Sequence, residues 1–154
     1  MVARAFSSAG VPDVKQPAGL CRTDGKGPDG MTLIHWKAGK PVVWDVTTIC
    51  TSASSYIDSS AREADAAAEI AAMRKTAKYS NLSSQHTFYP TAVETLGPLN
   101  EDARLSLSDL GRRISAASGD LRQVSFLFQK ISVVVQRFNA VLLHNSFVKD
   151  AQPE

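Results

Sequence analysis

Residues 41–49 read PVVWDVTTI, and this stretch decides the fold class. Its β-branched and aromatic residues predict a strand. A second β-prone run, residues 31–36 (MTLIHW), precedes it across the short segment KAGK, which is typical of a hairpin. Asp45 stands in the middle of the predicted strand, where a carboxylate is disfavoured. Buried, it needs a partner or a cation; the alternative is a strand-edge position that faces solvent.

The length of the hairpin turn decides whether a second acid joins Asp45. We expect a three-residue turn over residues 37–39, whose last residue is a glycine able to take the left-handed conformation. Met31 then faces Asp45 and Asp29 faces Thr47, which sets both aspartates on one face with Cβ atoms roughly 7–8 Å apart. Such a pair suits a hard cation such as Mg²⁺. A two-residue turn, by contrast, would place the acids on opposite faces.

Helices and one more strand are predicted after the hairpin. Residues 60–63 (SARE) form a capping box that opens an Ala-rich helix ending near Tyr79. Residues 87–93 (TFYPTAV) predict a short strand in which Pro90 marks an edge or a bulge. The fold class is therefore α/β (α+β), a small mixed sheet with a hairpin, one crossover helix and two C-terminal helices.

The two C-terminal helices carry clear boundary signals. Asn100 is a candidate N-cap for the first of them, and Gly119 is its predicted end. Asp120 is the candidate N-cap of the second, long helix. Its apolar stripe consists of Val124, Leu127, Ile131, Val134, Phe138 and Leu142. We divide the chain into a loop-rich lead-in (1–28), one domain (29–147) and a frayed tail (148–154).

Composition excludes several classes of protein. The chain has 154 residues, 44% of them hydrophobic, and a formal net charge of +2, which is typical of one globular domain. No unbroken apolar run approaches the ~20 residues of a membrane-spanning helix, so we expect no membrane partner. Two cysteines and three isolated histidines offer no zinc-ligand spacing. No secretory signal is visible, which favours an intracellular setting.

These residues resemble a known family of nucleases. GPDG at 27–30, followed by the hairpin and by WDVT at 44–47, resembles the Pro-Asp…(Asp/Glu)-x-Lys signature of restriction-enzyme-like endonucleases. More specifically, residues 10–147 resemble the C-terminal endonuclease domain of non-LTR retrotransposon polyproteins, downstream of their reverse transcriptase. The matching stretches are residues 19–26 (GLCRTDGK), 28–33 (PDGMTL), 43–47 (VWDVT), 74–79 (RKTAKY), 92–98 (AVETLGP), 110–114 (LGRRI) and 136–139 (QRFN).

The resemblance implies a catalytic site. Asp29 and Asp45 match the metal-binding acids, which would hold one or two Mg²⁺ ions. Thr47 occupies the position where this family often carries its lysine; in the retrotransposon branch the lysine comes from the following helix, as Lys-x-x-Lys-Tyr. Both Lys75 and Lys78 fit that pattern, with Lys75 the catalytic candidate. Glu94 matches an acidic position that could complete the metal site or orient the water.

The resemblance further implies an activity and partners. A restriction-endonuclease-like core would hydrolyse phosphodiester bonds and nick target DNA in the nucleus, as part of a polyprotein with an upstream reverse transcriptase. The candidate DNA-binding residues are the basic side chains of Lys78, Arg112, Arg113, Lys130 and Arg137. Two alternatives stay open: a catalytically silent nucleic-acid-binding remnant of that domain, and a small interaction module whose long terminal helix mediates dimerisation.

Overall fold

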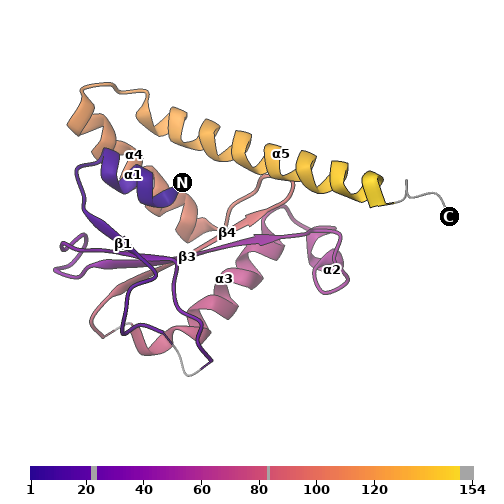
Figure 1. Cartoon of the computed structure of the whole chain (residues 1–154), viewed down its shortest axis with the longest axis horizontal. Coiled ribbons are helices and arrows are strands. Elements are labelled where there is room, and N and C mark those ends of the chain that lie inside the picture. Colours follow the sequence, from indigo (N-terminus) through magenta and orange to yellow (C-terminus); the bar gives the residue numbers. More distant parts are fainter. Residues whose placement is uncertain (22–23, 83, 150–154) are drawn as a thin grey trace.

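A four-stranded mixed sheet forms the middle layer of the protein (Figure 1), described here from a computed structural model. The structure describes residues 1–21, 24–82 and 84–149. The strand order is β1 (Asp13–Lys15), β2 (Gly30–Thr32), β3 (Val42–Ile49), β4 (Thr87–Glu94). The first three strands are antiparallel neighbours, whereas β4 runs parallel to β3. The predicted mixed α+β sheet with its crossover helix is confirmed.

Helices cover both faces of this sheet. On one face lie α1 (Val2–Ser8), α4 (Glu101–Ser118) and α5 (Gln123–Lys149), and on the other lie α2 (Ile57–Ser60), α3 (Ala66–Lys78) and the 3₁₀ turn η1 (Ser80–Leu82). The face toward α4 carries the larger apolar core, in which Trp44 stacks on Phe6 with ring centroids 4.7 Å apart. The face toward α3 is packed with small residues, among them Ala68, Ala71 and Ala92. Because alanines fill this contact, α3 lies close to the sheet.

The hairpin between β2 and β3 differs from the prediction. Lys37 pairs with Lys40, and the two residues between them both have positive φ, so the turn has two residues rather than three. Met31 pairs with Val43, not with Asp45, and the predicted register is wrong.

A bulged segment explains this shift of register. The hydroxyl of Thr32 accepts a hydrogen bond from the N–H of Val42 and donates one to the carbonyl of Ile34. Residues 33–35 therefore leave the strand, and β2 ends at Thr32, well before the predicted end at residue 36. Such a local rearrangement uses side-chain hydrogen bonds that the alternation of apolar and polar residues does not encode.

The crossover helix begins later than its capping box predicts. Residues 57–60 form the separate short helix α2, and α3 begins at Ala66 after Asp65, which has φ 68°. The predicted start at residues 60–63 is therefore wrong, while the predicted end near Tyr79 is confirmed. The 1–28 lead-in is likewise more regular than predicted: it contains the short helix α1 and β1, a strand that sequence reasoning missed.

The segment before α4 covers the last part of the outer edge of β4. Asn100 occupies the predicted N-cap position, but its Oδ1 accepts a hydrogen bond from the N–H of Ala92 instead of capping the helix. The N–H of Asn100 donates to the carbonyl of Ala92 at 3.2 Å, and Val93 pairs with Leu99. β4 is thus an edge strand, one of the two alternatives that Pro90 predicts, and residues 98–100 cover its free side at residues 92–94. Gly119 ends α4 with φ 76°, as expected.

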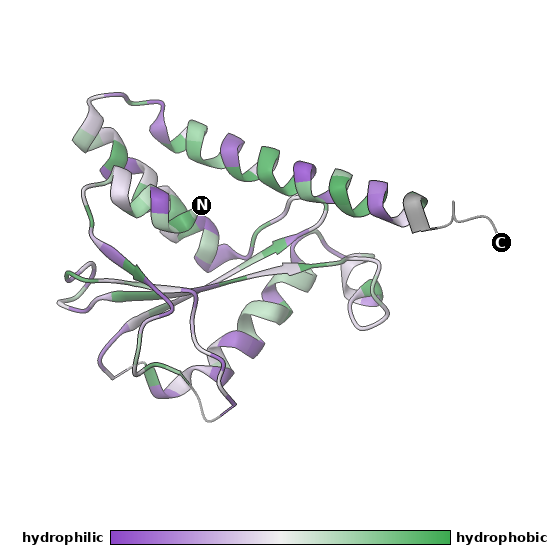
Figure 2. Cartoon of the chain, viewed as in Figure 1, coloured by the Kyte–Doolittle hydropathy of each residue, from purple (hydrophilic) through white to green (hydrophobic). Residues whose placement is uncertain are grey.

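Among the described residues, helix α5 buries apolar side chains against the domain only in its first half, and beyond it Asn139 Nδ2 donates a hydrogen bond to the carbonyl of Thr95. Leu127, Ile131 and Val135 are buried, whereas Phe138 and Leu142 are exposed although they continue the predicted stripe. Figure 2 shows apolar residues continuing along α5 where it extends past the sheet. Residues Gln123–Phe147 also meet the length and composition of a membrane-spanning segment, since an 18-residue window within them has a mean hydropathy of 1.3. The helix begins at Gln123, three residues beyond the predicted cap Asp120. The predicted frayed tail covers residues 148–154, of which residues 150–154 lie outside the described part of the chain.

Candidate functional site

Asp45 is a buried carboxylate at the centre of β3. Its side chain is 6% exposed, and it lies beside Pro90 of β4. Strand residues alternate between faces, so Asp45 points to the same side as Val43, which packs against Tyr79 and Leu82. That side is the α3 face of the sheet.

Lys75 of α3 is the partner of this carboxylate. Its Nζ lies 2.5 Å from Oδ2 of Asp45, and its side chain is 26% exposed. The alanine face of α3 turns toward the sheet, and Lys75 continues that face, while Met73 points to solvent. A helical wheel of α3 alone does not decide which face of the helix meets the sheet. The structure brings Asp45 and Lys75 together in a charge-assisted hydrogen bond.

Asp29 lies at the point where β2 separates from β3. Its N–H donates to the carbonyl of Trp44, and its Oδ2 accepts the N–H of Val46 at 2.7 Å. Without Asp29 that N–H would face the gap left by β2. The carboxylate is therefore engaged one residue along β3 from Asp45, and its residue is exposed.

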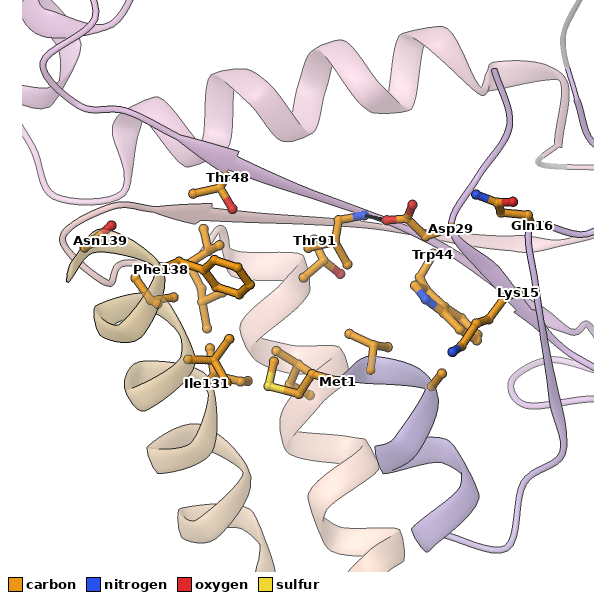
Figure 3. Close-up of a pocket in the computed structure, with 18 of the residues that line it drawn as sticks. Met1, Lys15, Gln16, Asp29, Trp44, Thr48, Thr91, Ile131, Phe138 and Asn139 are labelled. Atoms are coloured by element: carbon orange, nitrogen blue, oxygen red, sulfur yellow. Dashed lines mark hydrogen bonds between the residues drawn. The ribbon is translucent and has the colours of Figure 1, made fainter. Parts of the chain in front are cut away.

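The two aspartates do not form the predicted side-by-side pair. Asp45 faces α3, whereas Asp29 borders a cavity of about 650 Å³ on the opposite side, between the sheet, α1 and α5. Figure 3 shows the carboxylate of Asp29 level with the strands, bonded to the Val46 N–H, while Trp44 and Thr91 project into that cavity. The two carboxylates thus use different partners, Lys75 for Asp45 and the N–H of Val46 for Asp29.

Glu94 lies at the far end of α3 from Lys75. It is 3% exposed, and its Oε1 accepts the N–H of Ala68 in the first turn of α3 at 3.1 Å. Asp45 pairs with Pro90, four residues earlier on β4, a separation of about 13 Å along the strand. The structure therefore does not bring Glu94 to Asp45 and Lys75; it places this carboxylate where it stabilises the start of α3.

This position leads to a prediction for Glu94. Glu94→Gln keeps an acceptor for the Ala68 N–H but loses the charge that favours a helix N-terminus, and we expect it to lower the free energy of unfolding by about 1 kcal/mol. Glu94→Ala removes the acceptor as well and should cost more, about 1–3 kcal/mol. Urea unfolding measures both. Any nuclease activity should persist in Glu94→Gln. Loss of that activity in a variant that still folds would support the predicted catalytic role of Glu94.

The predicted DNA-binding residues fall into four situations. Arg113 is a structural residue: it donates to the carbonyl of Trp36 at 2.9 Å and lies over the Trp36 ring. Arg112 is exposed and lies 3.6 Å from Asp109. Lys78 Nζ lies 4.9 Å from the ring centroid of Tyr79, whereas Lys130 and Arg137 are exposed on α5.

Comparison with models of known protein families finds no match for this chain, and no significant match is found among curated proteins.

Proposed function

We propose that this chain is a Mg²⁺-dependent DNA endonuclease with a restriction-endonuclease-like core. The observation that carries the proposal is the contact between Lys75 and Asp45. A lysine supplied by the crossover helix, next to the acid of the central strand, is the arrangement that the resemblance implies for retrotransposon endonuclease domains. The order of hairpin, crossover helix, parallel strand and two C-terminal helices supports it further.

The residues present fit a magnesium ion in their chemistry. Asp45 offers a hard carboxylate oxygen beside Lys75, and Asp29 offers another that now accepts the N–H of Val46. Mg²⁺ is usually bound by one or two carboxylates, with water and substrate phosphates completing its shell. Within the described residues no cluster of three or more His, Cys, Asp or Glu side chains surrounds them. Asp45 would therefore hold the ion from the α3 side of the sheet, and Asp29 would join it only after its carboxylate leaves the N–H of Val46.

Each residue has a distinct task in phosphodiester hydrolysis. The bound ion would neutralise the charge on the phosphate and lower the pKa of its water. Lys75, held at Asp45, orients the attacking water or stabilises the negative charge that develops on the phosphate. Asp29 fixes the end of β2 through Val46 and so positions β3 at the site.

One feature favours a second candidate, a nucleic-acid-binding domain without activity. Lys75 already neutralises the carboxylate of Asp45, and Val46 occupies one oxygen of Asp29, so both acids have protein partners. In this alternative the ion pair holds α3 against the sheet, and Thr47 marks a lost catalytic position.

A plasmid-nicking assay separates the two candidates. The whole chain, incubated with supercoiled plasmid and Mg²⁺, is expected to produce open circles, and EDTA is expected to stop the reaction because the ion supplies the charge neutralisation. Agarose gels measure the rate. Supercoiled DNA that stays intact in Mg²⁺ and in Mn²⁺, while the protein binds it, would establish the second candidate and exclude the first.

A further inference from the structure

A second cavity, of about 480 Å³, opens between α1, β1 and the first turns of α5. We call it the basic hollow. Three cations from three separate elements line it: Arg4 of α1, Lys15 of β1 and Lys130 of α5. Among the described residues none of the three forms an ion pair, and no acidic residue lines the cavity. The basic hollow is therefore an uncompensated positive site.

An aromatic ring lies in the same wall. Phe126 lines the basic hollow and is 42% exposed, one turn before Lys130 on α5. The guanidinium of Arg122 lies 5.2 Å from its ring centroid and is paired with Asp120, so Arg122 contributes a stacking plane rather than a free charge. Proteins that bind single-stranded nucleic acids combine positive charge, which contacts the backbone, with exposed aromatic rings, on which the bases stack.

The basic hollow adjoins the larger cavity that reaches Asp29. The two share four lining residues, Met1, Ala3, Lys15 and Val134. Lys15 stands where they meet, and Figure 3 shows its amine turned toward α1. The larger cavity is mostly apolar and ends at Asp29 beside β3. An extended strand with phosphates on the cations therefore has room to continue along the sheet, with its bases against the apolar wall.

We infer that the basic hollow binds single-stranded nucleic acid, with Arg4, Lys15 and Lys130 on its phosphates and Phe126 stacked on a base. This binding does not depend on hydrolysis at Asp45, which lies on the opposite face of the sheet. Lys130 is one of the DNA-binding residues that the sequence analysis predicts, whereas Arg4 and Lys15 lie in the lead-in and were not predicted.

Fluorescence anisotropy with a labelled oligodeoxythymidylate tests the inference. The oligonucleotide is about 20 nucleotides long, so that it exceeds the binding site of one small domain, which covers roughly 4–16 nucleotides. The whole chain is expected to bind it in EDTA, with an affinity that falls as salt rises. Arg4→Gln/Lys15→Gln/Lys130→Gln should flatten the slope of log K against log salt by about 2, since each single-strand phosphate contact contributes about 0.7. Phe126→Leu should weaken binding on the order of tenfold at unchanged slope.

The control carries the same change of net charge elsewhere. Lys26→Gln/Lys37→Gln/Arg62→Gln removes three exposed cations from outside both cavities and should leave most of the affinity intact. Circular dichroism checks that all variants fold. The inference is overturned if the chain does not bind the oligonucleotide, if both triple variants weaken binding equally, or if polyglutamate of matched charge displaces the strand as well as unlabelled DNA does. Plasmid nicking is scored separately, so failure of hydrolysis and failure of strand binding are distinguishable.

Discussion

Replacing Lys75 by Met is expected to slow Mg²⁺-dependent nicking by about 10²–10³-fold, the usual cost of losing one group that stabilises charge in the transition state. The reason is that Lys75 Nζ lies at Asp45, where the scissile phosphate would approach the proposed site. Asp45→Asn keeps the shape of the side chain but removes the charge, and we expect at least as large a loss. The rate of open-circle formation under single-turnover conditions measures both.

Lys78 supplies the matched control. It lies one turn further along α3 and fits the same Lys-x-x-Lys-Tyr pattern, but its amine lies over Tyr79. Lys78→Met should therefore keep most of the nicking rate. If Lys78→Met abolishes nicking while Lys75→Met does not, the assignment of the catalytic lysine is reversed.

The same variants separate a catalytic role from a purely structural one. Removing one partner of a fully buried ion pair costs about 3–5 kcal/mol, and we expect the lower end for Lys75→Met because Lys75 is 26% exposed. Asp45→Leu/Lys75→Met removes both charges and should recover most of that free energy of unfolding. Urea unfolding measures the cycle. A double variant that is as stable as the parent and still nicks DNA would contradict the proposed mechanism.

Gly30→Ala is expected to cause the largest loss of stability from a single methyl group. A Cβ at this position would lie 2.2 Å from Cζ2 of Trp44, a ring that is almost fully buried and stacks on Phe6. The indole cannot move without disturbing the core under α1, so we expect a loss of about 3 kcal/mol, the upper end of the range for overpacking. Thermal and urea unfolding measure it.

Two comparisons isolate the steric cause. Gly10 has φ 71° and nothing within 4 Å of an added Cβ, so Gly10→Ala should cost only the left-handed backbone strain of about 1–2 kcal/mol. Adding Trp44→Phe to Gly30→Ala frees space, and the double variant should lose less stability than the sum of its single changes. Strict additivity would show that the ring at position 44 is not the cause.

Much of the fold follows from local sequence signals. β3, β4, α4 and the end of α3 lie where periodicity, Asn100 and Gly119 place them. β1 has only three residues, too few for an alternating pattern to be visible. Glu94, which is remote in sequence, accepts the N–H of Ala68 in the first turn of α3, a contact that a local capping box does not encode.

The candidate site was predictable in its residues more than in its geometry. A carboxylate inside an apolar strand indicates a buried partner, and Lys75 is that partner. The relation of Asp29 to Asp45 depends on the hairpin register, and the bulge at residues 33–35 changes that register through the hydroxyl of Thr32. Arg4 and Lys15 were missed because only the fold brings the lead-in next to α5.

The covered edge of β4 has a consequence for behaviour at high concentration. Residues 98–100 occupy its outer side at residues 92–94, Pro90 has no N–H to offer there, and the opposite rim of the described sheet is β1, with three residues. Intermolecular β-aggregation needs a long exposed strand on which another chain can add. Neither rim offers one, so the native sheet is a poor template for fibril growth.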